Sequence, residues 1–221
     1  MRSCKVAGCN RPAIHSRSPY CPAHKARSRR HGHPNQRAIT KADLAPYQRQ
    51  VKEWIDSREN TDTLRLRLQE RWSAVVSKAE ETERLWNAGS PMNSYERDAY
   101  LELLKVARDV DAQAIAEAMV GMGLMQELSP RSFMDDASYR TQLSRRFRGL
   151  TDLNAGTWYD HAESRTKKAY KELSPKAAQQ LGQILAVVFN PIASMINRKI
   201  NETVSQEEAT KRALFEALEE A

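Results

Sequence analysis

The feature that most constrains this chain is the placement of its three cysteines, which all lie within the first 21 residues of 221. With one histidine they form the pattern C-x4-C-x11-C-x2-H, made by Cys4, Cys9, Cys21 and His24. Three soft thiolates and one imidazole are a standard ligand set for a tetrahedral structural zinc ion. An odd, clustered set of cysteines is more typical of a metal site than of a disulfide framework. The sequence therefore predicts a Zn²⁺ site near the N-terminus.

Residues around these ligands favour a compact local fold. Gly8 suits a tight turn before Cys9, because glycine tolerates positive φ. Pro22 suits the first turn of a short helix, which would carry His24 one turn beyond Cys21. The alternatives for the fourth ligand are His15, His31 and His33. Four protein ligands leave no position for water, so we expect the metal to fold this segment and not to catalyse a reaction.

Positive charge is concentrated in the same segment. Residues 1–37 contain nine basic side chains and no carboxylate, since the first acidic residue is Asp43. The whole chain has a formal net charge of +7, yet residues 38–221 hold 26 basic and 28 acidic side chains. Such asymmetry is typical of a segment that binds nucleic acid or another anion. The candidate phosphate contacts are Arg11, Arg17, Lys25, Arg27, Arg29, Arg30 and Arg37.

The densest basic stretch, residues 25–30, directly follows His24. Arginine binds phosphate through two parallel N–H groups, so we expect affinity that falls steeply with salt and discriminates little between sequences. DNA is favoured over RNA as the partner, and an acidic protein surface is the alternative. A second cluster, Arg145, Arg146 and Arg148, could add a phosphate contact, although we interpret it as a solvated surface.

Residues 1–34 contain the stretch CKVAGCNRPAIHSRSPYCPAHKARSRRHGHP. This stretch resembles the small zinc modules of many phage and prophage-encoded proteins, in which a GC-x-RP knuckle is followed by C-x2-H and a basic R-x-RRHG-x-P tail. The resemblance implies a mobile-element origin and carries no activity by itself. The chain lacks the further histidine and asparagine constellation of an HNH nuclease, because its only later histidine is His161. We therefore assign no nuclease activity and no catalytic residues.

The rest of the chain has the apolar periodicity of α-helices. One stripe runs from Leu44 to Trp54 and follows Asp43, which we expect to cap that helix. A second runs from Leu68 to Trp86 with the 3.5-residue repeat of a bundle or coiled-coil seam. Gly89-Ser90-Pro91 ends it, and a third helix is expected over residues 94–122. The last two predict a long helical hairpin, whose seam lies either within the chain or between two copies in a homo-oligomer.

Residues 127–173 give the weakest pattern. Asp160, His161 and Glu163 invite an acid–base interpretation, but no nucleophile accompanies them and we consider the group incidental. Ser174-Pro175 predicts a helix start, and the apolar run 181–189 predicts a central buried helix. We expect Asn190-Pro191 to end that helix and a capping box, Ser205 to Glu208, to begin the last one.

The sequence thus predicts a mainly α protein, with a small N-terminal zinc-binding module followed by a multi-helix bundle with a long helical hairpin. The expected divisions are 1–37, 38–126 and 127–221, or 38–221 as one domain. The start of the chain is charged and lacks the apolar core of a signal peptide, so we expect no secretory signal. No run of about 18 apolar residues occurs, so we expect no membrane span and a cytoplasmic location. We expect a non-enzymatic nucleic-acid-binding accessory protein. The alternative is a protein-binding adaptor or inhibitor that docks on a host protein.

Overall fold

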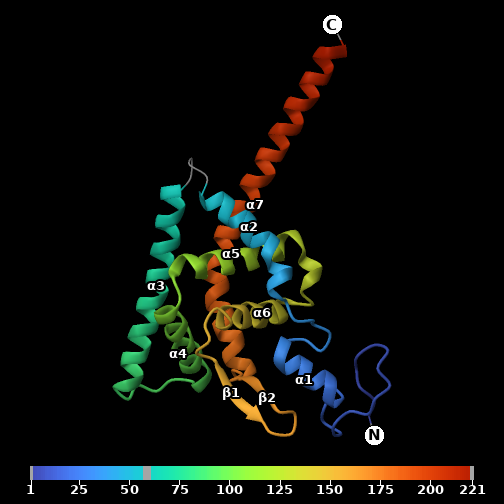
Figure 1. Ribbon diagram of the computed structural model, residues 1–221, viewed down its shortest axis with the longest axis vertical. Helices are drawn as coiled ribbons and strands as arrows, with labels where there is room; N and C mark the ends of the chain where they lie inside the picture. Colours follow the sequence, from blue (N-terminus) through green and yellow to red (C-terminus); the bar gives the residue numbers. More distant parts are fainter. Residues whose placement is uncertain (1, 57–60, 220–221) are drawn as a thin grey trace.

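A computed structural model describes residues 2–56 and 61–219 of the chain (Figure 1). Its helices are α1 Pro22–His31, α2 Lys41–Asp56, α3 Thr61–Asn87, α4 Ser94–Asp109, α5 Ala112–Leu128, α6 Asp136–Arg148 and α7 Pro175–Glu219. The 3-10 turn η1 Pro130–Ser132 precedes α6, and the strands β1 Ala155–Asp160 and β2 Arg165–Tyr170 follow it. The expected mainly α class is confirmed, with a cysteine-containing segment followed by a helical bundle.

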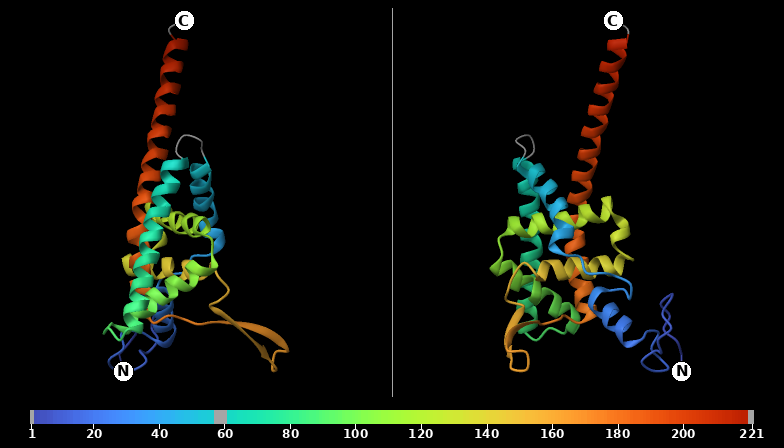
Figure 2. Two further views of the ribbon diagram at one scale, coloured as in Figure 1. Left: turned by 90° about the vertical axis from the view of Figure 1, so that its left-hand side faces the viewer. Right: turned by 45° about the vertical axis from the view of Figure 1, so that its right-hand side comes forward.

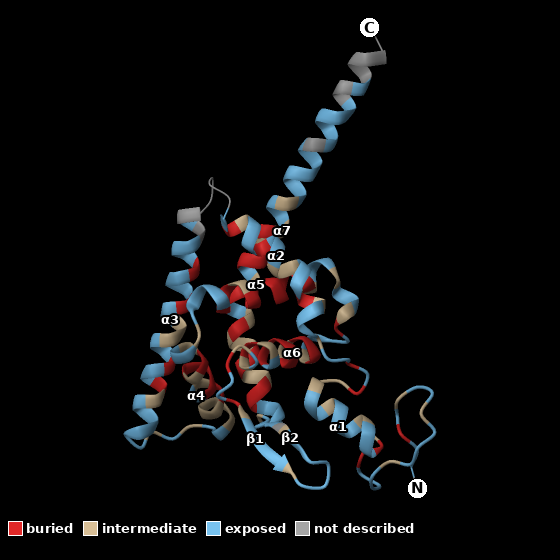
Figure 3. Ribbon diagram, viewed as in Figure 1, coloured by how far each residue is buried: buried red, intermediate tan, exposed pale blue. Residues whose placement is uncertain are grey.

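Helix α7 is the axis around which the other helices pack. Its N-terminal half contacts α4, α5 and α6 and buries Leu181, Leu185 and Phe189 completely. The apolar run 181–189 therefore lies at the centre of the body, as its composition predicted. The C-terminal part of α7 extends away from the body and is exposed along most of its length (Figure 3).

Two expected helix ends do not occur in α7. Pro191 lies inside the 45-residue helix, which also continues through Ser205, where a new helix was expected to begin. A proline inside a helix removes one backbone donor and costs about 3 kcal/mol. Burial of Phe189 and Ile192 on either side of Pro191 outweighs that cost. The prediction of separate helices here was wrong, because tertiary burial overrides the local preference.

The third expected helix is divided in two. Helix α4 ends at Asp109, and Asp111 caps α5 by accepting hydrogen bonds from the backbone N–H groups of Gln113 (2.9 Å) and Ala114 (3.2 Å). A single helix over 94–122 was therefore wrong, because an aspartate N-cap competes with helix continuation at this point. The expected hairpin is consequently formed by α3 with the shorter α4.

The 3.5-residue seam of α3 packs within the chain. Leu68 and Trp72 are buried, and the Trp72 ring lies 6.1 Å from the ring of Phe147 and 5.9 Å from that of Phe189, between centroids. These partners belong to α6 and α7, so the seam faces the body of its own chain. Of the two arrangements that the sequence allows, the structure therefore has the one in which the seam lies within the chain.

The start of α2 also differs from expectation. The hydroxyl of Thr40 accepts a hydrogen bond from the Asp43 N–H (3.2 Å), and the Asp43 carboxylate accepts one from the Thr40 N–H (2.9 Å). This reciprocal pair is a capping box in which Thr40, and not Asp43, is the N-cap. The stretch Asn60-Thr61-Asp62 predicts a break and a new cap after α2. Asn60 lies outside the described residues, and α3 begins at Thr61.

One hydrophobic core contains side chains from every helix between α2 and α7. The segments expected at 38–126 and 127–221 therefore share a core. Gly123 lies inside α5, where a Cβ atom would approach the Ala193 Cβ to 2.7 Å, so it permits close helix packing and does not end the helix. Among the described helices, none combines the length and apolar character that crossing a bilayer requires.

The weakly patterned region forms α6 and a two-stranded β-hairpin that leaves the body (Figure 2). Strands β1 and β2 are antiparallel, and Trp158 stands opposite Lys167. The Asp160 carboxylate accepts hydrogen bonds from the backbone N–H groups of Ala162 (2.9 Å) and Glu163 (3.3 Å) and also pairs with Lys167. These contacts build the hairpin turn, which gives Asp160 and Glu163 a structural role.

Helices α6 and α7 cross closely at Gly182. A Cβ atom at this position would lie 2.1 Å from the backbone oxygen of Arg140. One turn earlier, Gln179 Nε2 donates hydrogen bonds to the Ala137 carbonyl (2.5 Å) and to Thr141 Oγ1 (2.7 Å). Because Gly182 has no side chain, the backbones of α6 and α7 can approach this closely.

We predict that Gly182→Ala lowers the free energy of unfolding by about 3 kcal/mol, because two backbones would have to separate to admit the methyl group. Urea unfolding followed by circular dichroism measures this change. The matched control is Gly156→Ala, where the nearest atom to the new Cβ lies 3.8 Å away and we expect a change below about 1 kcal/mol. Equal stability of the two variants would contradict the close crossing.

Candidate metal centre and basic surface

The four candidate metal ligands lie together beside the start of α1. Their ligand atoms are all within 4.8 Å of one another in the set Cys4, Cys9, Cys21 and His24. His24 Nδ1 lies 3.4 Å from both Cys4 Sγ and Cys21 Sγ, and Cys9 Sγ lies 3.9 Å from Cys21 Sγ. A tetrahedral ion with metal–sulfur bonds of about 2.3 Å requires separations of about 3.8 Å between sulfurs and about 3.5 Å between sulfur and nitrogen. The four residues can therefore hold a metal ion.

Short backbone contacts explain why this stretch closes on itself. An isolated antiparallel bridge joins Ser3 to Pro12, on either side of the first two cysteines. Gly8 makes the intervening turn with a φ of +75°, as its place before Cys9 predicted. Positive φ is strained for residues with a side chain, so glycine is the residue that this turn requires.

Helix α1 carries the other two ligands. Cys21 is its N-cap residue and Pro22 its first residue, so His24 follows Cys21 by one turn. The expectation of a short helix that begins at a proline is confirmed. Local sequence alone therefore brings the last two ligands together.

The environment of Cys4 favours its metal-binding form. Burial raises the pKa of this thiol, but hydrogen bonds from the backbone of Cys21 and Val6 and from the side chain of His24 outweigh burial and lower the pKa to about 6. Cys4 and Cys21 are buried and Cys9 is half-buried. A lowered pKa increases the thiolate fraction of Cys4, and the thiolate is the form that binds metal.

The alternative histidine ligands lie outside the cluster. His15 is exposed, and Nδ1 of His33 accepts a hydrogen bond from a nearby backbone N–H at 3.2 Å. His31 Nδ1 is hydrogen-bonded by Gln142 Nε2 at 3.1 Å. In the described part of the chain, His24 is thus the histidine that completes the cysteine set.

Two buried glutamines fix the segment after α1 onto the body. Gln36 Nε2 donates to the Ser132 carbonyl (3.0 Å), and its Oε1 accepts a backbone N–H from the same loop (3.0 Å). Gln142 of α6 donates to His31 and accepts from the Ile39 N–H (3.2 Å). Both glutamines are at most 2% exposed, and buried hydrogen bonds of this kind specify a unique arrangement.

Gly32 lets α1 end directly against α6. Its φ is +89°, and a Cβ atom there would lie 2.7 Å from the Ala137 carbonyl oxygen and from Thr141 Oγ1. Glycine is therefore required both by the left-handed conformation and by space. The stretch His31-Gly32-His33-Pro34, which follows the basic residues of α1, is therefore where α1 contacts α6.

All seven candidate phosphate-contacting side chains are exposed. They are Arg11, Arg17, Lys25, Arg27, Arg29, Arg30 and Arg37. Arg30 pairs with Glu172 (2.8 Å) and Arg37 with Asp43 (3.2 Å). Exposed pairs of this kind contribute little to stability and compete only weakly with a bound anion. The N-terminal segment thus presents a cationic surface, and four of its cations belong to α1.

The second arginine cluster is only partly solvated. The Arg148 side chain is 12% exposed, and its Nε lies 3.0 Å from Glu102 Oε1. Arg145 is exposed and lies beside α1, where it approaches the Arg30 carbonyl at 3.5 Å. The expectation of a solvated surface therefore fails for Arg148, because its buried carboxylate partner holds it in the body.

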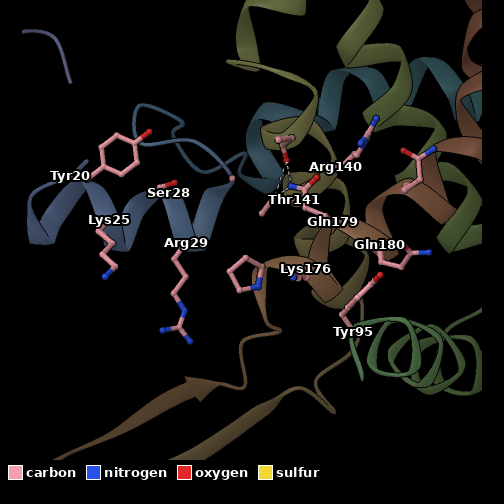
Figure 4. A pocket seen from close by; sticks show the side chains of 14 residues that line it. Tyr20, Lys25, Ser28, Arg29, Tyr95, Arg140, Thr141, Lys176, Gln179 and Gln180 are labelled. Carbon is pink, nitrogen blue, oxygen red and sulfur yellow. Dashed lines mark hydrogen bonds between the residues drawn. The ribbon is translucent and has the colours of Figure 1, made fainter. Parts of the chain in front are cut away.

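Sequence reasoning missed two cations that the fold brings to the same place. A cleft of about 690 Å³ lies between α1 and the start of α7, and Lys25 and Arg29 line it together with Arg140 and Lys176 (Figure 4). No local signal marks Arg140 and Lys176, since they are more than 100 residues from α1 in the sequence. Only the packing of α6 and α7 places them there.

Comparison with family models, with curated proteins and with solved structures finds no match to this chain. The resemblance of residues 1–34 to phage zinc modules therefore stays a prediction.

We predict that Cys9→Ser and His24→Ala each remove most of the bound metal, because three remaining ligands do not complete the tetrahedron. Elemental analysis of the purified protein gives the metal content per chain. The matched control is His15→Ala, which changes a histidine outside the cluster and should keep stoichiometric metal. Full metal retention by His24→Ala would contradict the ligand set.

His31 should remain neutral to unusually low pH. Burial, followed by the positive charges of Arg145, Arg30 and Arg27, lowers the pKa of His31 from its ordinary 6.5 to about 4. The unfolded chain then binds more protons than the folded one between pH 4 and 6.5, so this contribution to stability is present above pH 6.5 and is lost as pH falls through that interval.

Nuclear magnetic resonance titration of the His31 ring measures this property directly. Denaturant unfolding at several pH values should show a shallower loss of stability for His31→Gln than for the parent protein over the same interval. A ring that titrates near 6.5 would contradict the burial of His31 against α6.

Proposed function

We propose that this protein is a non-enzymatic, zinc-containing accessory protein that binds nucleic acid through its N-terminal segment. One observation carries the proposal. Residues 1–37 present the seven candidate cations at the surface, contain no carboxylate and are folded about a Cys3His ligand set. Nucleic-acid backbones are the common polyanions that such a surface binds.

Zinc is the metal that fits this donor set best. Three thiolates and one imidazole within tetrahedral distance match its preferred ligands, and they fill all four positions. A catalytic zinc ion keeps one position for water. We therefore assign the ion a structural role, in which it orders residues 4–24 and so holds the basic side chains in place.

Phosphate contact by α1 accounts for the expected binding properties. Helix α1 has only 10 residues and carries Lys25, Arg27, Arg29 and Arg30. A helix this short reaches few bases in a DNA groove, but its four cations can contact several phosphates of the nucleic-acid backbone. Affinity should then depend on salt more than on base sequence. DNA is the preferred partner. The resemblance of residues 1–34 supports a phage or mobile-element origin, with action in the cytoplasm of the host cell.

We predict that replacing Lys25, Arg27, Arg29 and Arg30 by alanine weakens duplex binding for all sequences. Each phosphate contact contributes about 0.9 to the slope of log affinity against log salt, so the slope should decrease by up to about 3.6. Fluorescence anisotropy at several sodium chloride concentrations measures the slope. The matched control replaces Arg198 and Lys199, which are exposed cations on the extended part of α7, and should leave the slope unchanged.

Two results would contradict the proposal. One is an unchanged slope in the α1 variant that retains its metal and its circular dichroism spectrum. The other is absence of binding to duplex or single strands at low salt, which would instead favour an acidic protein as the partner of the same cations.

A further inference from the structure

The cleft between α1 and the body has walls from distant parts of the chain. Helix α1 supplies Lys25 and Arg29, whose side chains leave the same side of the helix (Figure 4). Arg140 comes from α6 and Lys176 from the first turn of α7. Polar lining between these walls comes from glutamines of α7, namely Gln179, Gln180 and Gln183.

The charge of the cleft is entirely positive. Four of its fourteen lining residues are cations, and none of these described lining residues is acidic. The neighbouring carboxylate of Glu172 pairs instead with Arg30, which does not line the cleft. Residues 38–221 have a small net negative charge, so a cluster of this kind is not the average surface of the body. Cations that line one cleft repel one another, and a bound anion removes that repulsion.

The walls are held rigidly. Gly32 seats the end of α1 on Ala137 and Thr141, and Gly182 seats α7 on the backbone of Arg140. The N-terminal end of α7 adds its partial positive charge beside Lys176. A site whose cations are already in position loses less entropy when it binds.

Aromatic rings stand on both sides of the cleft. Tyr20 comes from the N-terminal segment and Tyr95 from the first turn of α4 (Figure 4). The Lys176 ammonium lies 5.9 Å from the centroid of the Tyr95 ring. Cations combined with aromatic rings are the features by which proteins bind single strands, through phosphate contacts and base stacking.

The size of the cleft separates one strand from two. A volume of about 690 Å³ lies in the range of sites for small ligands, about 300–1,000 Å³. A double helix, which pairs two backbones around its stacked bases, does not enter a space of this volume. A few nucleotides of one strand do, with their phosphates and bases both accessible.

We propose that this cleft binds a short single-stranded segment of nucleic acid, with Arg140 and Lys176 of the body as phosphate contacts opposite Lys25 and Arg29 of α1. The inference rests on the proposed function and gives it a second contact surface. Duplex DNA meets the cations of α1 alone, whereas a single strand also meets Arg140 and Lys176 on the other wall of the cleft.

The test compares labelled oligothymidylate of about 12 nucleotides, within the usual site sizes, with a duplex of equal length. In the full-length, metal-loaded protein, Arg140→Gln with Lys176→Gln should lower the salt slope for the single strand by about 1.4, since each contact contributes about 0.7. The slope for the duplex should not change. Lys176→Glu alone changes an exposed residue and should weaken single-strand binding further than Lys176→Gln.

The matched control is Lys199→Gln, which changes an exposed cation on the same helix roughly 35 Å further along. It should leave both slopes unchanged. Thymidine monophosphate is the second probe: inhibition only at concentrations far above those of the oligonucleotide supports a strand, and equal potency overturns it in favour of a mononucleotide site.

The two proposals fail in distinguishable ways. If single-strand binding is present and depends on Lys25 and Arg29 but not on Arg140 or Lys176, the cleft proposal is overturned and the proposed function stands. If neither single strand nor duplex binds at low salt, the proposed function fails and the cleft proposal fails with it.

Discussion

One stretch of helix α6, residues 137–142, holds the two parts of the molecule together, because two glycines meet it. Gly32 brings the end of α1 onto Ala137 and Thr141, and Gly182 brings α7 onto the backbone of Arg140. Close contact of backbones leaves little freedom for either helix to shift, since protein interiors are packed without spare volume. The positions of the metal-ligand segment and of the central helix therefore depend on the same few residues.

This arrangement connects the candidate metal centre to the body. The N-terminal segment is too short to bury a core of its own, and a metal ion held by Cys4, Cys9, Cys21 and His24 would supply the missing stabilisation. Gln36 and Gln142 then attach the segment that follows it to η1 and α6. The cations on α1 are thereby held in a fixed orientation relative to the body, whereas those of a flexible basic arm would not be.

Local patterns predicted the helices well and their ends less well. The stripe of α3 and the buried run of α7 follow from apolar spacing, because spacing decides which face of a helix is buried. The continuous path of α7 through Pro191 does not follow, since burial of neighbouring residues decides it. Asp111 is a recognisable N-cap residue, but the apolar spacing on both sides of it predicted one continuous helix where α4 ends and α5 begins.

By itself, the sequence determined the candidate metal-ligand set and the basic surface. Cys4, Cys9, Cys21 and His24 lie within 21 residues of one another, so their spacing is a local property that needs no knowledge of the fold. Tertiary structure alone decided that Arg140 and Lys176 line the same cleft as α1, and that the α3 seam is internal. Such contacts join residues far apart in the chain, and they depend on how helices pack, which no short pattern of residues records.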